Sequence, residues 1–248
     1  MARRHPPRPG TCGVNPASPQ GRGVLVVGSS SPIGQAIQTR FAGDTVVGVA
    51  LDEPADLVAD CSTAAGAAAA VQTVVDRAGS LDVVVLAAAV MPVAPITTTT
   101  DAQWQSAFDA ILGTAFAVCR AVLPILSPGG AIVAVSSVNA TLAAPGLPAY
   151  AAAKAGLEGL VRQLALDFGP RGVRVNAVAP GFIDDGSDPA KAAGYPLGRT
   201  GRPAEVADAV HFLAGAGFVT GVVLPVDGGL SIASPAAFLR DDLRERWL

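Results

Sequence analysis

Ser137, Tyr150 and Lys154 are the residues of this sequence whose types and spacing best suit chemistry. Tyr150 and Lys154 stand four positions apart, so a helix would place both side chains on one face. An ammonium beside a phenol favours the phenolate, which would let Tyr150 exchange a proton near neutral pH. Ser137 follows the apolar run 131–135, where a hydroxyl at a strand end could reach the same substrate oxygen. The three side chains predict an acid–base site that uses neither histidine nor metal.

Apolar runs alternate with helix-like segments from residue 23 onward. The predicted strands cover 24–27, 45–49, 57–59, 83–86, 131–135, 173–179 and 222–226. The predicted helices cover 32–41, 64–77, 101–126, 150–168 and 203–213, and a charged helix-like stretch covers 236–248. Strands that are apolar throughout and alternate with helices are typical of a parallel sheet covered on both faces. The pattern predicts an α/β fold with a doubly wound parallel sheet.

Composition narrows the class of protein. The 248 residues suit one large domain, for which we expect the range 23–248. A net charge of −3 argues against a nucleic-acid partner, and no apolar run reaches the roughly 18 residues of a membrane span. Three widely spaced cysteines (Cys12, Cys61 and Cys119) form no metal or disulfide pattern, which favours a reducing cytoplasm.

Residues 1–22 differ from the rest of the chain. They are rich in Arg, Pro and Gly and lack the apolar segment of a secretory signal. We predict a disordered tail or an over-extended start site, with a basic interaction arm as the alternative.

The segment 27–34, Val-Gly-Ser-Ser-Ser-Pro-Ile-Gly, joins the first predicted strand to the first predicted helix. A strand, a Gly/Ser loop and a helix N-terminus together make an anion site. Gly28 would permit the tight turn and Gly34 close packing of the helix, while Ser29, Ser30 and Ser31 add hydroxyl donors. The segment predicts a phosphate-binding loop, and an ordinary Ser/Gly turn is the alternative.

In order and spacing, these motifs resemble those of the short-chain dehydrogenase/reductase family over about residues 23–231. The loop 27–34 is similar to the family's T-G-x-x-x-G-x-G, and Ser137 with Tyr150-Ala-Ala-Ala-Lys154 matches its catalytic serine and Y-x-x-x-K. The segment 81–89 lies where the family has its fourth strand and N-N-A-G. The segment 174–181 resembles the family's sixth strand and its P-G turn, and the segment 226–229 resembles its C-terminal V-D-G-G. The resemblance implies a Rossmann-like oxidoreductase with a nicotinamide cofactor.

The resemblance also implies a role for each residue. Tyr150 would protonate a carbonyl oxygen as hydride arrives, Ser137 would hydrogen-bond that oxygen, and Lys154 would lower the pKa of Tyr150 and hold the nicotinamide ribose. Asp60 and Cys61 would flank the adenine. The implied cofactor-binding residues are Gly28, Ser30, Ser31, Ile33, Gly34, Asp52, Asp60, Cys61, Ala87, Ala88, Tyr150, Lys154, Pro180, Gly181 and, near the nicotinamide carboxamide, Ile183.

Asp52 favours NAD over NADP. It ends the second predicted strand, where a carboxylate can accept hydrogen bonds from the adenosine ribose and would repel a 2′-phosphate. The loop 29–31 carries no Lys or Arg to favour that phosphate. A solvated loop acid is the alternative.

Several positions depart from the family pattern. Pro32 replaces the central loop glycine, Leu86–Ala89 replaces N-N-A-G, Ala110 replaces the helix asparagine of the proton relay, and Asp185 replaces the threonine after P-G. Two rival hypotheses follow: a degenerate member that binds nucleotide as a scaffold, and a redox-neutral dehydratase or isomerase.

The expected partners are a small to medium, largely apolar alcohol or ketone and further copies of the chain. Family members are usually dimers or tetramers that assemble through the long helices and the C-terminal region, and the stripe of leucines and valine over 157–166 is compatible with this. The candidate substrate-lining residues are Val138, Asn139, Leu142, Leu147, Phe182 and Tyr195.

Overall fold

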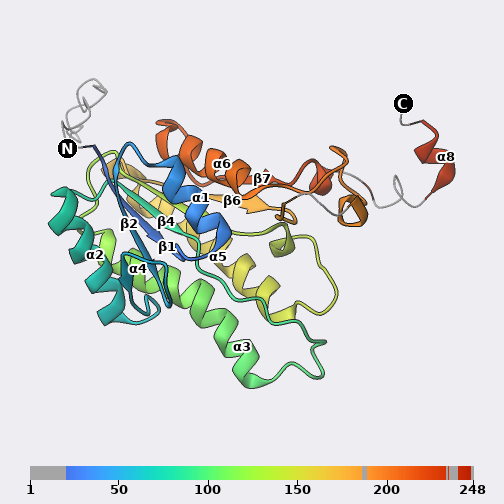
Figure 1. Ribbon diagram of the computed structural model, residues 1–248, viewed down its shortest axis with the longest axis horizontal. Helices are drawn as coiled ribbons and strands as arrows, with labels where there is room; N and C mark the ends of the chain where they lie inside the picture. The colour runs from blue at the N-terminus through green and yellow to red at the C-terminus, as the bar shows by residue number, and fades with distance from the viewer. Residues whose placement is uncertain (1–20, 186–188, 233, 235–239, 247–248) are drawn as a thin grey trace, which may run out of the picture.

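The computed structural model describes residues 21–185, 189–232, 234 and 240–246. Their strands form one seven-stranded sheet in the order β3-β2-β1-β4-β5-β6-β7, and every pairing is parallel (Figure 1). This confirms the predicted doubly wound α/β fold. The strands are β1 (Gly23–Val27), β2 (Thr45–Ala50), β3 (Leu57–Val58), β4 (Val83–Leu86), β5 (Ala131–Val135), β6 (Arg174–Pro180) and β7 (Val223–Val226).

Helices cover both faces of the sheet. Figure 1 shows α1 (Pro32–Arg40) and α6 (Pro203–Gly215) on one side, and α2 (Ala64–Ala78), α4 (Thr114–Val122) and α5 (Pro148–Phe168) on the other. Each side has its own core of buried aliphatic residues. The central strands β1, β4 and β5 are buried along their whole length, which explains their continuous apolar sequences.

The single helix predicted over 101–126 is wrong in detail. The structure divides it into α3 (Asp101–Phe108), a π-helical turn at Asp109–Gly113, and α4, which ends at Val122. Pro124 explains the early end, because a proline lacks the N–H and disfavours helical backbone at the residue before it. At the π turn, the Thr114 hydroxyl donates to the carbonyl of Asp109 at 3.1 Å.

The remaining differences lie at the ends of elements. Helix α5 begins two residues earlier than predicted because Pro148 suits a first helical position. The short helices are η2 (Val138–Ala140), η3 (Gly169–Arg171), η4 (Pro189–Ala192), η5 (Leu230–Ile232) and α8 (Asp241–Arg244). Much of the helix-like stretch 236–248 lies outside the described residues.

The predicted tail falls mostly outside the described residues, which begin at position 21. Arg22, which the sequence assigned to the tail, pairs with Asp44 at 2.8 Å just before β1. Over the ranges that the structure covers, no helix has the length and apolar character needed to cross a membrane.

Candidate active site

Three consecutive residues at the end of β5 each bond to a different turn of α5. The carbonyl of Val135 accepts a hydrogen bond from Lys154 Nζ at 2.6 Å, and Ser136 Oγ donates to Glu158 Oε1 at 2.8 Å. Ser137 hydrogen-bonds to Tyr150 through its side chain. These three rungs fix α5 against β5, and we refer to residues 131–168 as the β5–α5 unit. The structure thus brings together Ser137, Tyr150 and Lys154, which the sequence singled out.

Burial dominates the electrostatics of the pair on α5. It raises the pKa of Tyr150, and the hydrogen bond from Ser137 acts in the opposite direction. Burial lowers the pKa of Lys154 to about 7, while the negative charge of Glu158 acts to raise it. Lys154 Nζ lies 5.6 Å from the centre of the Tyr150 ring. Lys154 is not among the causes of the shift in the Tyr150 pKa, so the expectation that it lowers the pKa of Tyr150 stays a prediction, and the raised pKa favours the protonated phenol.

The loop between β1 and α1 depends on its glycines. Gly28 has a φ of +88°, and a Cβ there would lie 2.5 Å from the amide nitrogen of Ala88. A Cβ at Gly34 would lie 2.2 Å from the carbonyl oxygen of Gly28. Pro32 occupies the first position of α1, where its missing N–H costs no helical hydrogen bond. The loop closes on the end of β4 as a dinucleotide-binding loop requires.

Two of the serines in this loop hydrogen-bond within the protein, and the third is buried. Ser31 Oγ caps α1, accepting from the Gly34 amide at 3.0 Å and donating to the Gly28 carbonyl at 2.9 Å. Ser30 Oγ donates to Asp52 Oδ1 at 2.8 Å, and Ser29 is fully buried. Backbone N–H groups at the start of α1, such as that of Ile33, are further donors suited to a phosphate.

Asp60 and Cys61, the two residues expected at the adenine, differ in the exposure of their side chains. Asp60 is exposed, and its Oδ1 accepts hydrogen bonds from the amide and hydroxyl of Ser62 at 2.9 and 2.7 Å. The Cys61 side chain belongs to the core, where burial raises its thiol pKa to about 11. Any contact of Cys61 with an adenine must therefore use its backbone.

The expected nicotinamide end lies where β4 and β6 finish. Ala87 and Ala88 follow β4, and the Ala87 amide donates to the Val27 carbonyl at 2.8 Å, so backbone bonding ties the strands without the family's asparagines. Pro180 ends β6, and Gly181 follows it. Ile183 forms a parallel bridge with Gly201, which holds this segment beside the start of α6.

Tyr195 supports the turn after β6, although the sequence placed it among substrate-lining residues. Its hydroxyl accepts a hydrogen bond from the Phe182 amide at 2.6 Å, and it is 9% exposed. A Cβ at Gly181 would lie 3.0 Å from the Tyr195 ring, and one at Gly229 would lie 2.9 Å from Pro196. The P-G and V-D-G-G segments thus leave room for Tyr195 and Pro196 between them.

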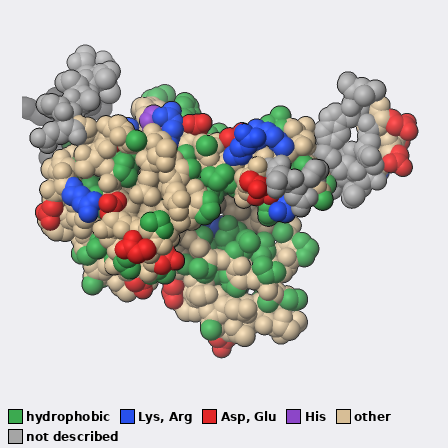
Figure 2. Space-filling view, viewed as in Figure 1, with side chains coloured by type: hydrophobic (Ala, Val, Ile, Leu, Met, Phe, Trp, Pro, Cys, Tyr) green, Lys and Arg blue, Asp and Glu red, His purple; other side chains and the backbone are tan. Residues whose placement is uncertain are grey.

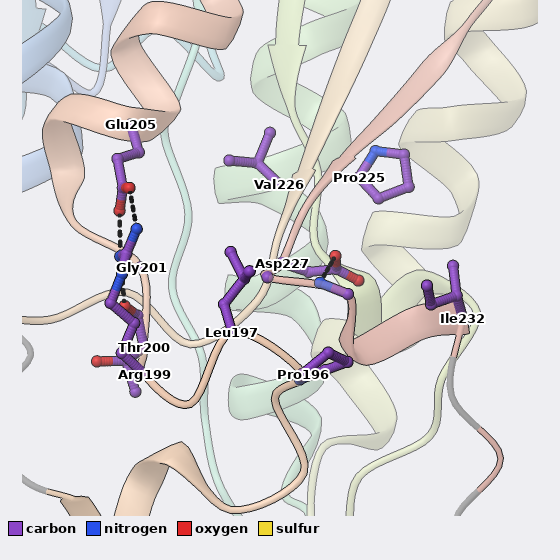
Figure 3. Close-up of a pocket in the computed structure, with 12 residues that line it drawn as sticks. Pro196, Leu197, Arg199, Thr200, Gly201, Glu205, Pro225, Val226, Asp227 and Ile232 are labelled. Carbon is purple, nitrogen blue, oxygen red and sulfur yellow. Dashed lines mark hydrogen bonds and ion pairs between the residues drawn. The ribbon is translucent and has the colours of Figure 1, made fainter. Parts of the chain in front are cut away.

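A cavity of about 450 Å³, lined in part by Pro196, lies between the end of β7 and the start of α6 (Figure 3). The Arg199–Glu205 ion pair on its wall closes at 2.5 Å, and the Asp227 carboxylate accepts from the Gly229 amide at 3.0 Å. Its lining does not include Ser137, Tyr150 or Lys154. The cavity borders the site but does not contain the acid–base groups.

Sequence reasoning missed the apolar segment that follows β4. Val90, Met91 and Val93 are exposed, and the Ala94 amide donates to the Gly146 carbonyl at 2.9 Å, so this segment lies against the loop before α5. Figure 2 shows hydrophobic side chains gathered beside a hollow on this face of the molecule. The rule that parallel strands present ligands at their carboxyl ends could have identified the segment.

The sequence also missed Glu158, which is 5% exposed. It continues the four-residue spacing of Tyr150 and Lys154 along α5, and that spacing was the available signal.

The chain is similar to known reductases and dehydrogenases over most of its length. A family model described as enoyl-(acyl carrier protein) reductase matches residues 40–231. The 3-oxoacyl-[acyl-carrier-protein] reductase of Pseudomonas aeruginosa is 35% identical over 85% of this chain and 98% of its own length. The cis-4-hydroxycyclohexanecarboxylate dehydrogenase of Sinomonas cyclohexanicum is 38% identical over 84% and 96%. A blue fluorescent protein from a metagenomic library, solved with NADPH, superimposes with a TM-score of 0.78 at 28% identity, covering 86% of this chain and 98% of that one.

Proposed function

The chain belongs to the short-chain dehydrogenase/reductase family, and on that premise we propose that it reduces a ketone or oxidises an alcohol through Ser137, Tyr150 and Lys154. The observation that carries the proposal is the β5–α5 unit, whose rungs hold all three side chains in one place. A protonated phenol beside a serine hydroxyl suits the delivery of a proton to a carbonyl oxygen.

Tyr150, Ser137 and Lys154 have different roles in the proposed proton transfer. Tyr150 gives its proton to the carbonyl oxygen, and Ser137 stabilises the negative charge that develops there. The bound nicotinamide supplies the hydride. Lys154, buried and bonded to the Val135 carbonyl, places a positive charge beside Tyr150 when protonated, which stabilises the phenolate left behind.

The fit of a dinucleotide rests on the loop between β1 and α1. The close approach of Gly28 to Ala88 and the exposed N-terminus of α1 support a pyrophosphate there. We propose NAD as the preferred cofactor because Ser30 holds Asp52 at 2.8 Å, beside the loop and in place to receive ribose hydroxyls.

Replacing Asp52 with serine should raise kcat/KM for NADPH relative to NADH by about tenfold, equivalent to about 1.4 kcal/mol, because the repulsion of a 2′-phosphate is removed. Steady-state kinetics with both cofactors measure the ratio. Glu53→Gln is the matched control, since this neighbouring carboxylate accepts from the Ala55 amide and should leave the ratio unchanged. A wild-type enzyme that already prefers NADPH would contradict the assignment.

The proposed substrate is a small to medium alcohol or ketone with a largely apolar body. Val138 is buried beside Ser137, Leu142 is exposed in the loop after η2, and Phe182 is exposed just after β6. A panel of cyclic and aliphatic ketones and alcohols, followed by nicotinamide absorbance, tests the proposal. Turnover that is lost in Tyr150→Phe supports it, and absence of turnover with either cofactor across the panel would reject it.

The same panel separates two rival functions. A scaffold protein would show weak or absent nucleotide binding by calorimetry and no absorbance change. A redox-neutral enzyme would consume substrate without a net absorbance change, which product analysis by mass spectrometry would reveal.

We also propose that the chain forms a homo-oligomer. Phe212 and Phe218 are 59% and 104% exposed beside β7, the edge strand of the sheet, and exposed apolar side chains there favour association. The α5 stripe contributes less than expected because Leu157 and Val161 are buried in the core. The free, buried Cys61 and Cys119 fit the proposed cytoplasmic location.

Sedimentation velocity at micromolar concentration should therefore give a dimer or tetramer. Phe218→Asp should reduce the assembly, since a carboxylate would be buried at the contact. The matched variant Val58→Asp changes an exposed apolar residue on β3, at the opposite edge of the sheet, and should leave the assembly intact. A monomeric wild-type protein would refute the assembly.

A further inference from the structure

Glu158 is a buried carboxylate one turn beyond Lys154 on α5. It is 5% exposed, and Ser136, itself 3% exposed, donates to its Oε1 at 2.8 Å. Its Oε2 faces Arg162 Nη1 at 4.0 Å, a long contact to a side chain that is 58% exposed. A buried carboxylate is costly unless it is bonded, so this position calls for an explanation beyond helix packing.

We infer that Glu158 is a positioning residue for proton transfer: Ser136 fixes its carboxylate one helical turn along α5 from Lys154, where its negative charge favours the cationic lysine next to Tyr150. The geometry that carries the inference is the set of rungs at Val135, Ser136 and Ser137. Ser136 stands between the two residues that bond Lys154 and Tyr150, so the carboxylate is fixed by the same strand end that orients the acid–base pair.

The charge of Lys154 depends on this neighbour. Burial alone disfavours the ammonium and lowers its pKa to about 7, and Glu158 opposes that effect. Lys154 is protonated below its pKa and neutral above it, so the cation is lost as the pH rises through this value. Without the charge of Glu158 the pKa falls further, and the cation is lost at a lower pH.

Other charged groups on the elements packed against α5 are bonded elsewhere. Asp109 of the π turn accepts from Gln105, and Asp167 of α5 accepts from Gln163. Arg171 of η3 stacks on Phe168, Arg174 of β6 donates to carbonyls at the end of α6, and Asp101 begins α3. Among the residues that the structure describes, Glu158 is the charged group that shifts the Lys154 pKa.

The π turn packs against α5, the helix that carries Lys154 and Glu158. It contains Ala110, and a Cβ at Gly156 of α5 would lie 3.1 Å from Leu112 of the turn, so the turn packs closely on α5. Ala110 has no polar side chain to offer Lys154, whereas Glu158 presents a carboxylate from the same helix as the lysine.

The test uses Glu158→Gln, whose amide oxygen can still accept from Ser136 but carries no charge. Asp167→Asn is the matched control, because it removes one negative charge from the exposed side of the same helix. Lys154 ionisation is followed by NMR of protein labelled with carbon-13 at the lysine side chains, with Lys154→Met used to assign the signal. We expect the Lys154 midpoint to move to lower pH in Glu158→Gln and to stay at the wild-type value in Asp167→Asn.

The effect on turnover rests on the proposed oxidoreductase activity, whereas the NMR titration does not. In an active enzyme the alkaline limb of the kcat profile should move with the Lys154 midpoint, which a merely structural role would not cause. An unchanged Lys154 midpoint in Glu158→Gln would overturn the inference even if the enzyme is active. Should that variant not fold, Ser136→Ala releases the carboxylate at unchanged net charge and should lower the midpoint; no shift there would equally overturn it.

Discussion

Replacing Tyr150 with phenylalanine should lower kcat for carbonyl reduction by about 10²–10⁴, the usual contribution of a positioned general acid. The ring keeps its volume, so packing on the β5–α5 unit is retained while the proton donor and the bond to Ser137 are lost. Stopped-flow measurement of the hydride step in both proteins gives the comparison directly.

Calorimetric titration with NADH provides the control for the Tyr150 variant. Because the phenylalanine ring should leave the loop between β1 and α1 untouched, NADH affinity should stay close to the wild-type value. A variant that retains most of its turnover would show that another group donates the proton.

Gly28→Ala should destabilise the fold by about 2–5 kcal/mol, because a positive φ is costly for alanine and the added Cβ collides with backbone. The Cβ would lie 2.5 Å from the amide nitrogen of Ala88 and 2.6 Å from the carbonyl carbon of Ala87, neither of which can rotate away. The free energy of unfolding in urea measures the loss, and NADH affinity should fall with it because the loop must move away from β4.

Gly43→Ala is the matched control for this variant. A Cβ at Gly43 meets nothing within 4 Å, and its φ is not positive, so the change should stay within about 0.5 kcal/mol. Equal stability of the Gly28 and Gly43 variants would mean that the loop does not approach β4 as described.

The sequence was sufficient to predict the sheet, its layers and the proximity of Tyr150 to Lys154, because these depend on local patterns. Continuous apolar runs identify central parallel strands, and the four-residue spacing of Tyr150 and Lys154 needs only a helix to bring them together. The end of α4 was also readable, since Pro124 is present in the sequence, but the run of good helix formers before it outweighed that signal in the prediction.

Features that depend on long-range contacts were not readable. The pKa of Tyr150 is set by how deeply the phenol is buried, which the spacing of residues does not reveal. Tyr195 supports the turn after β6 because two glycine segments far apart in the sequence leave space for its ring. In each case the residue type was compatible with two roles, and the tertiary partner decided between them.

The hydrogen bonds between β5 and α5 hold the proposed acid–base residues together within one continuous segment of the chain. In the proposed mechanism one strand end and one helix carry the groups that move a proton, whereas the segments after β4 and β6, which we expect to line the mouth of the site, come from other parts of the chain. Exchanging those mouth segments could therefore redirect the enzyme to new carbonyl compounds without retuning its proton chemistry. Conversely, transplanting residues 131–168 as one block would carry the proton donor, its lysine and its buried carboxylate together.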